Sequence, residues 1–299
     1  MSSPSSDLRV VLAPFGGVVR ENVDLAPFLH VRLGGPARWF VEPRTEADVA
    51  RVVRACNELG WPLRVLGGGS NLLVADEGVD GVVLSLAAFQ RTVRDGTLVT
   101  AGAGVSLPSL LRQTKDAGLA GLETLVGVPA QVGGAVAMNA GTREGETFAK
   151  LASLVVVTPS GETEVWDRAR MRPRYRDGGL DGAIVLHATF ALEPDDPAAI
   201  FARLEASLKR RNATQPVTEK SVGCVFQNPE CAPAAKLIDD AGCKLMRVGR
   251  IVVSAKHANY FVNEGGGTCR DFLALVAAVQ ERVRDRFGVE LVPEVKIWR

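Results

Sequence analysis

A stretch of 19 residues without a charged side chain, residues 124–142, constrains the fold of this chain most strongly. Its length alone would suit a membrane-spanning helix, which needs about 20 apolar residues. However, it contains four glycines, Pro129, Gln131 and Asn139, and these helix breakers and side-chain amides are unfavourable in lipid. We therefore expect a loop-rich part of a soluble core.

Length and charge narrow the class of protein further. At 299 residues the chain is too long for one ordinary core, and we expect three parts: 1–90, 91–211 and 212–299. The 35 Lys and Arg residues balance 34 Asp and Glu residues, so no net field favours nucleic acid or an anionic membrane. An anionic substrate would need locally placed Arg, Lys and backbone N–H groups.

The cysteines and the first residues indicate the compartment. The five cysteines are scattered without a C-x-x-C pair, and there are three histidines, so we expect no metal site. Reduced thiols are typical of the cytosol. The start, MSSPSSDLRVVLAP, lacks a basic region followed by an apolar core and a cleavage site. We therefore expect no signal peptide and a cytoplasmic protein.

Capping patterns and hydrophobic periodicity predict a mixed α+β order. A capping box at Thr45 and Asp48 begins a helix that Gly60 ends. Ser106 and Thr268 are further predicted caps, and the helix after Thr268 should bury one face, with Phe272, Val276, Val279, Val283 and Phe287 on it. Helices are also expected over 197–211 and 232–241. Strands are expected at 37–41, 63–66, 72–75, 81–86, 183–192, 247–254, 259–262 and 289–298, with a hairpin of 154–157 and 162–166 and a partly ordered leader over 1–36.

Two glycine-rich loops are candidates for cofactor binding. In the first, Gly67 to Asn71, three glycines follow a strand, so backbone N–H groups can approach a pyrophosphate closely. Neither a G-x-G-x-x-G nor a Walker pattern is present, and a plain tight turn is the alternative. The second, Gly127 to Gly141, is apolar with a few amides and suits a flat heterocycle. Its alternative is a tightly packed crossing of chain segments.

Several motifs share the order and spacing of one known family. They are LGGGSN-LLVAD-G, GLETLVGVPAQVGGAVAMNAG, the pair Tyr175-Arg176, GCVFQNP, AAKLIDDAG, VSAKHANYFVN and VELVPEVKIW. With them the chain resembles the UDP-N-acetylenolpyruvoylglucosamine reductase (MurB) family from about Asn22 to the last residue. No extra insertion follows the Tyr-Arg segment, so the resemblance is to the shorter, type II branch.

The resemblance implies a fold, a reaction and cofactors. The fold is an α+β FAD-binding fold of the vanillyl-alcohol-oxidase (PCMH) kind in two subdomains, followed by an α+β substrate-binding domain whose last strand returns Glu294 to the active site. The reaction is the reduction of UDP-N-acetylenolpyruvoylglucosamine to UDP-N-acetylmuramate, with non-covalent FAD and NADPH, in peptidoglycan precursor synthesis. The implied FAD-binding residues are Leu66, Gly67, Gly68, Gly69, Ser70, Asn71, Leu72, Gly127, Val128, Pro129, Gln131, Val132, Gly133, Met138, Asn139, Ala140 and Gly141.

The same resemblance implies three catalytic residues. Arg176 would stabilise the negative charge that develops on the substrate, because a guanidinium grips a carboxylate with two hydrogen bonds. Glu294, in an apolar strand where burial could raise its pKa, would polarise the intermediate. Cys224 stands where most relatives have Ser; with a reference pKa of about 8.5, a thiol can donate the proton. The alternatives are a surface arginine, an edge-strand glutamate and a small buried apolar residue.

The last predictions concern the substrate-binding residues and the positions where this sequence differs from the family pattern. The resemblance points to Arg211, Asn228, Lys244 and His257 for the diphosphate and sugar, with solvated surface groups as the alternative. Leu29-His30 stand where relatives usually have Thr-Thr, before the turn Gly34-Gly35-Pro36, and Ala130-Gln131 replace the usual Gly-Thr in the second glycine loop. The protein is expected to be a monomer.

Two other functions remain open. One is another FAD-dependent oxidoreductase that oxidises a small alcohol or sugar with oxygen, although the first loop has no His or Cys for covalent flavin attachment. The other is a flavin-binding homologue that has lost catalysis. The presence of both Arg176 and Glu294 argues against it.

Overall fold

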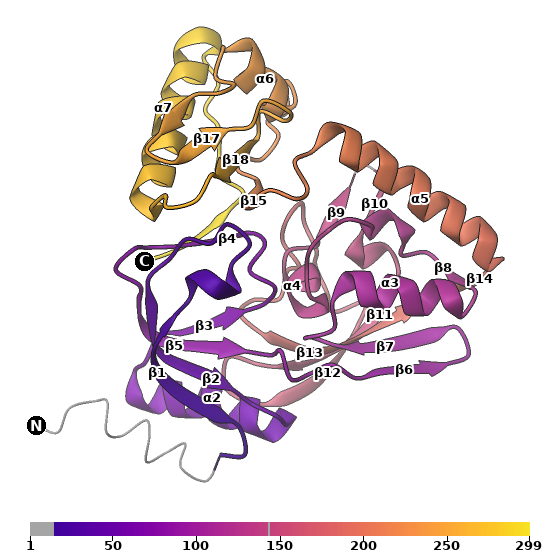
Figure 1. Cartoon of the computed structure of the whole chain (residues 1–299). Coiled ribbons are helices and arrows are strands. Elements are labelled where there is room, and N and C mark those ends of the chain that lie inside the picture. Colours follow the sequence, from indigo (N-terminus) through magenta and orange to yellow (C-terminus); the bar gives the residue numbers. More distant parts are fainter. Residues whose placement is uncertain (1–14, 143) are drawn as a thin grey trace, which may run out of the picture. The chain divides into compact units, whose positions relative to one another are not determined.

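The computed structural model describes residues 15–142 and 144–299, and these form two compact units. Unit 1 contains the described residues up to Asn22, together with Arg38–Gly68 and Asp80–Lys209. Unit 2 contains Val23–Ala37, Gly69–Val79 and Arg210–Arg299. Each unit is therefore built from several separate stretches of chain (Figure 1). The division into 1–90, 91–211 and 212–299 stays a prediction.

The first sheet has the strand order β1 (Val18–Asp24), β2 (Pro36–Glu42), β5 (Val79–Ser85) and β3 (Leu63–Leu66). Helix α2 (Glu46–Leu59) begins with the predicted capping box at Thr45, and Gly60 ends it with φ +69°. Its apolar face joins the core of the sheet. Strand β1, and the short 3-10 helix η1 (Ala26–Phe28) after it, lie in the segment expected as a leader. Alternation of polar and apolar residues in β1 is weak, so no pattern marked it.

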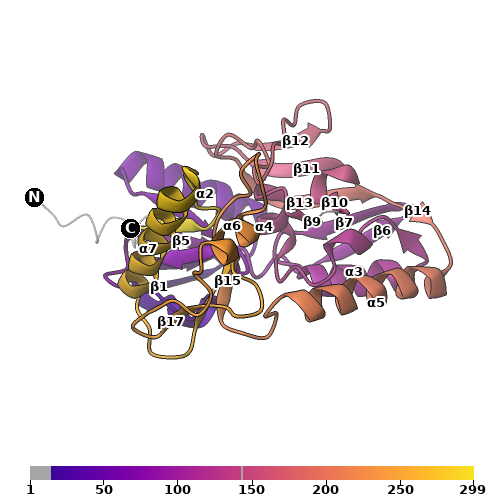
Figure 2. The ribbon, with the colours of Figure 1, turned by 90° about the horizontal axis from the view of Figure 1, so that it is seen from above.

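The second sheet of unit 1 has the order β12 (Thr163–Asp167), β11 (Leu151–Val157), β13 (Ile184–Ala191), β7 (Leu98–Gly102) and β6 (Thr92–Asp95). The predicted hairpin is confirmed as β11 and β12, with Gly161 at φ +85° in the turn. Helix α3 (Leu107–Asp116) is capped by Ser106 as expected. Helix α5 (Pro197–Thr214) lies beside α3 (Figures 1 and 2). Lys115 of α3 lies over the Phe201 ring of α5.

The charge-free stretch of unit 1 contains more structure than expected. The short elements β8 (Leu119–Ala120) and η2 (Glu123–Leu125) lead into it, and helix α4 (Val132–Ala137) lies within it. The expected loop-rich segment was wrong for α4, because small residues let this helix pack on the second sheet. A Cβ at Gly133 would lie 2.8 Å from the Ala103 Cβ. The pair β9 (Gly141–Thr142) and β10 (Gly145–Glu146) and the 3-10 helix η3 (Thr147–Ala149) follow it.

Unit 2 centres on the sheet β15 (Ser221–Cys224), β18 (Tyr260–Asn263), β17 (Ile251–Val253) and β16 (Arg247–Val248). The strand expected at 247–254 was wrong, because Gly249 at φ +53° folds it into the tight hairpin β16–β17. Helices α6 (Ala234–Asp240) and α7 (Cys269–Phe287) accompany this sheet, and the capping box at Thr268 is confirmed. Phe261 packs between Phe226 and Phe272.

The end of the chain differs from the prediction in two respects. Phe287 is 38% exposed and does not share the buried face of α7, because the helix ends there at Gly288. The strand expected at 289–298 shortens to β19 (Lys296–Trp298), since residues 289–295 lie outside any strand apart from an isolated bridge at Pro293. Strand β19 pairs in parallel with β4 (Leu72–Val74). None of the helices that the structure describes is long and apolar enough to cross a membrane.

Candidate functional site

The first glycine loop connects β3 to β4 without a helix, as expected. Within the described part of the chain, no backbone hydrogen bond comes from the amides of Gly67, Gly68, Gly69 and Ser70. At Gly69 φ is +64°, and a Cβ there would lie 2.2 Å from the Phe28 carbonyl oxygen. Only glycine fits this position. Unused N–H groups at glycines, where no side chain blocks the approach, suit the oxygens of a pyrophosphate.

The second glycine loop lies against the unit 1 part of the first. A Cβ at Gly68 would lie 3.3 Å from the Gln131 amide nitrogen, and one at Gly67 would lie 3.6 Å from the Gly134 Cα. A Cβ at Gly134 would meet no atom within 4 Å, so space is open there. The loop is fixed by the Gly133 amide, which donates to the Ala103 carbonyl at 2.9 Å. The residues present therefore fit FAD, which needs close backbone approach and room for a flat ring.

The other members of the two loops differ in exposure. Leu66, Leu72, Val132 and Asn139 are buried, so the first three can contribute backbone atoms only. The other predicted residues of the second loop are half-buried or exposed, namely Gly127, Val128, Pro129, Gln131, Gly133, Met138, Ala140 and Gly141.

Asn139 has a structural role that the sequence did not reveal. Its side-chain amide donates to the Glu146 carboxylate at 2.8 Å and to the Arg174 carbonyl at 3.1 Å. Its side-chain oxygen accepts from the Phe148 amide at 3.3 Å. Because these bonds occupy the side chain, Asn139 fixes the end of the second glycine loop from inside unit 1.

Arg176 lies at the same end of the second loop. Its Nη1 donates to the Gly141 carbonyl at 3.1 Å, and its guanidinium carbon lies 5.1 Å from the centre of the Tyr175 ring. The segment approaches α4 closely, since a Cβ at Gly178 would lie 2.4 Å from the Val136 carbonyl oxygen. The structure thus brings Arg176 and the second glycine loop together in unit 1.

Cys224 and Glu294 come together in unit 2. Cys224 is half-buried and pairs with Tyr260 across β15 and β18. The carbonyl of the next residue, Val225, accepts the Glu294 amide at 2.8 Å. Glu294 is half-buried and precedes β19, so the expected place inside a long apolar strand was wrong. A backbone hydrogen bond therefore joins the two segments that carry these side chains.

Two asparagines stabilise the segments that carry Cys224 and Glu294, and sequence reasoning did not assign them this role. The Asn71 side-chain amide donates to the Glu294 carbonyl at 3.3 Å, and the Asn71 carbonyl accepts from Lys296 at 3.1 Å. Asn259 accepts from the Phe226 amide at 2.9 Å and donates to the Phe226 carbonyl at 2.8 Å. Both lie within quoted motifs, but only their long-range partners reveal what they do.

Two of the four predicted substrate residues lie near Cys224. The His257 ring meets the Tyr260 ring edge-on, with centres 4.8 Å apart. The Tyr260 hydroxyl donates to the Gln215 side chain at 3.2 Å, and the Gln215 amide donates to the Arg211 carbonyl at 2.8 Å. Nε of Arg211 is buried and has no hydrogen-bond partner among the described residues. A buried N–H without a partner is costly, so this nitrogen is a candidate to bind a ligand.

The other two predicted substrate residues support α6. The Asn228 side chain accepts from the Ala234 amide at 2.9 Å, at the beginning of the helix. Lys244 forms an ion pair with Asp239 at 2.6 Å. The structure therefore gives both side chains a local partner and does not group them with Tyr260.

The buried thiols contrast with Cys224. Burial raises the pKa of Cys56 to about 12 and that of Cys269 to about 11, where Asp76 and Glu77 add to the rise. These thiols are unreactive at neutral pH. Cys224 is half-buried, which leaves it accessible for chemistry.

Comparison with known proteins identifies the family. Residues 215–298 match the C-terminal domain of UDP-N-acetylenolpyruvoylglucosamine reductase, and residues 37–166 match an FAD binding domain. UDP-N-acetylenolpyruvoylglucosamine reductase 2 of Symbiobacterium thermophilum is 41% identical over 100% of this chain and 97% of the relative. The chain belongs to the UDP-N-acetylenolpyruvoylglucosamine reductase family. The reductase of Geobacter metallireducens is 40% identical over 95% of each chain.

Solved structures confirm the fold expected for a member of this reductase family. The reductase (MurB) of Thermus caldophilus is 37% identical and superposes with a TM-score of 0.83, covering 95% of this chain and 100% of its own. A BBE-like protein of Physcomitrella patens, at 20% identity, has a TM-score of 0.50 over 62% of this chain. The predicted α+β FAD-binding fold with a C-terminal reductase domain is therefore confirmed.

Proposed function

We propose that this chain reduces UDP-N-acetylenolpyruvoylglucosamine to UDP-N-acetylmuramate with FAD and NADPH, in peptidoglycan precursor synthesis. The observation that carries the proposal is the coverage of the family match: relatives named for this activity align over the full chain at about 40% identity. The unused amides of the first glycine loop and the position of Arg176 at Gly141 support it.

The two glycine loops would hold the cofactor. The amides of the first loop would bind the pyrophosphate, and the apolar surface from Val128 to Gly141 would contact the ring system. When bound, FAD supplies the hydride carrier, which takes a hydride from NADPH and gives one to the vinyl carbon of the substrate. No covalent attachment is proposed.

The proposed catalytic residues supply charge and a proton. Arg176 would bind the substrate carboxylate with its guanidinium, which is already oriented by Gly141 and Tyr175. The Cys224 thiol would donate its proton to the carbon next to the one that receives hydride, and solvent would return that proton. The double bond thereby gains one hydride and one proton. Glu294 would help polarise or stabilise the intermediate, from a segment that its backbone amide fixes to the Val225 carbonyl.

Substrate binding is proposed for Arg211, Asn228, Lys244 and His257. Arg211 has the strongest support, because its buried Nε lacks a partner within the described structure. Asn228 and Lys244 would have to share their present partners, Ala234 and Asp239, with a substrate.

The setting of the protein is also a proposal. We expect a cytoplasmic monomer that acts on a small-molecule UDP-sugar and binds neither nucleic acid nor a membrane. The functional parts would be FAD-binding subdomains at 1–90 and 91–211 and a substrate-binding domain at 212–299.

Product analysis tests the proposed reaction. The purified holoprotein is incubated with NADPH and enolpyruvyl-UDP-N-acetylglucosamine, and the sugar nucleotide is analysed by mass spectrometry. A product heavier by two hydrogen atoms, formed only when NADPH is present, supports the proposal. Unchanged substrate with continuous oxygen consumption would contradict it and favour an oxidase.

A further inference from the structure

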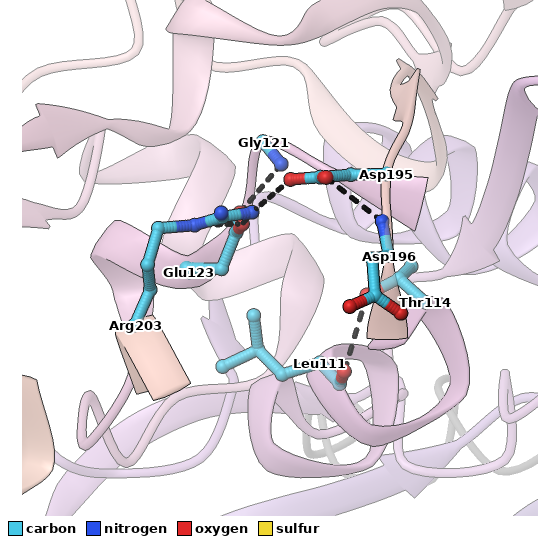
Figure 3. Close-up of polar contacts among 7 residues, drawn as sticks. All are labelled: Leu111, Thr114, Gly121, Glu123, Asp195, Asp196 and Arg203. Atoms are coloured by element: carbon cyan, nitrogen blue, oxygen red, sulfur yellow. Dashed lines mark hydrogen bonds and ion pairs between the residues drawn. The ribbon is translucent and has the colours of Figure 1, made fainter. Parts of the chain in front are cut away.

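An ion-pair cluster on unit 1 lies where the chain enters the second glycine loop (Figure 3). Arg203 of α5 donates from Nε and Nη2 to one carboxylate oxygen of Glu123, at 3.1 and 2.7 Å. Its Nη2 also donates to Asp195 at 2.6 Å. The cluster thus joins α5, the start of η2 and the segment before α5.

Glu123 extends this cluster to the backbone. Its second carboxylate oxygen accepts the Gly121 amide at 2.5 Å, and its carbonyl accepts the Val126 amide at 3.1 Å. Gly127, where the second glycine loop begins, follows directly. One side chain therefore fixes the turn before the loop, and its own partner comes from α5.

Burial of its carboxylate distinguishes Glu123 from the acid of an ordinary surface ion pair. The Glu123 side chain is only 13% exposed. Burial by itself would raise the pKa of Glu123, but the hydrogen bonds from Arg203 and the Gly121 amide hold that pKa below its usual value. Hydrogen bonds from Arg203 and the Asp196 amide also lower the pKa of Asp195. A half-buried carboxylate with charge-assisted bonds has a fixed geometry.

A second strand pair holds the other side of the turn. Strand β14 (Glu193–Pro194) pairs with β8, so that the Asp195 amide reaches the Gly118 carbonyl at 2.9 Å. A Cβ at Gly121 would lie 2.8 Å from Cε of Lys150, which is itself paired with Glu193. The turn is therefore enclosed between the Lys150 side chain and the Glu123 carboxylate.

We propose that Arg203 and Glu123 are positioning residues for the second glycine loop, and that their pairing sets how tightly the protein holds its flavin. The proposal rests on the proposed function in one respect, since it requires this loop to bind FAD. Arginine is needed because its planar fork reaches Glu123 and Asp195 together, which a single ammonium group cannot do with the same geometry.

The test measures FAD affinity instead of turnover. Flavin is removed from the holoprotein and restored by titration. The proteins compared are the parent, Arg203→Met, Glu123→Gln and the double variant. Lys209→Met is the control, because it removes an exposed charge from the same helix. We expect Arg203→Met and Glu123→Gln each to raise the FAD dissociation constant about tenfold. The double variant should bind FAD no more weakly than either single variant. The control should bind FAD like the parent.

Flavin spectra and the melting temperatures of the apoproteins distinguish a positioning role in flavin binding from a role in fold stability alone. The visible circular dichroism of the bound flavin should change in Arg203→Met and Glu123→Gln. Arg203→Lys, which keeps the charge, should give an intermediate FAD affinity. Unchanged FAD affinity and spectra together with lower melting temperatures of the apoproteins would overturn the proposal. A parent that binds no flavin would overturn the proposed function itself.

Discussion

At the scale of single residues, the account depends most on Cys224. Cys224→Ser should keep substantial reductase activity, because a hydroxyl occupies the same place on β15, and Cys224→Ala should lose most of it, because no proton donor remains. Stopped-flow absorbance of the reduced flavin, mixed with the substrate, measures the reoxidation rate. Reoxidation of the Ala variant at the parental rate would rule out Cys224 as the donor.

A second prediction at the scale of single residues concerns Arg176. Arg176→Lys keeps the charge but loses the planar fork, so we expect reoxidation by the substrate to slow by about tenfold or more, while flavin reduction by NADPH changes less. Both half-reactions are followed separately under anaerobic conditions. An equal loss in the two would mean that Arg176 supports the loop at Gly141 and does not bind the substrate.

At the scale of elements, helix α7 depends on a cap that comes from a distant part of the chain. Asp76, just after β4, accepts the amides of Cys269 and Arg270 at 2.7 and 3.0 Å. Asp76→Ala should lower the free energy of unfolding by about 1–2 kcal/mol, as loss of a helix cap does. Glu77→Ala is the matched control, because its ion pair with Arg270 is exposed. Equal melting temperatures for the two variants would contradict this role.

The Glu123–Arg203 pair predicts a pH dependence. Because the folded protein lowers the pKa of Glu123, the pair stabilises the fold above the ordinary glutamate pKa of about 4.3, and that contribution disappears as the pH falls through the lowered value. Glu123→Gln should therefore melt below the parent at neutral pH, and the gap should narrow in acid. Thermal unfolding at pH 7 and at about pH 3 measures this, and a gap that widens in acid would refute it.

At the scale of the whole molecule, local features were predictable and distant pairings were not. The caps at Thr45, Ser106 and Thr268 depend on residues three positions away, so the sequence was sufficient for them. The bond from Asn71 to the Glu294 carbonyl spans 223 positions, and that from the Cys269 amide to the Asp76 carboxylate spans 193. No local pattern encodes such pairs.

The same limit applies to the candidate site. The motifs singled out the two glycine loops and Arg176, Cys224 and Glu294 as candidates, because residue types and spacing carry that information, and their roles stay predictions. They did not indicate that Gly69–Val79 belongs to unit 2, or that Asn139 is buried with its side chain bonded inside unit 1. Those facts follow from packing between segments far apart in the sequence.

An anaerobic absorbance trace tests the central claim most directly. The purified protein receives NADPH first and enolpyruvyl-UDP-N-acetylglucosamine second, while the flavin bands are recorded. The account predicts that the bands bleach with NADPH and return with the substrate, without oxygen. Bands that return only when oxygen is admitted, or a protein that shows no flavin bands at all, would contradict it.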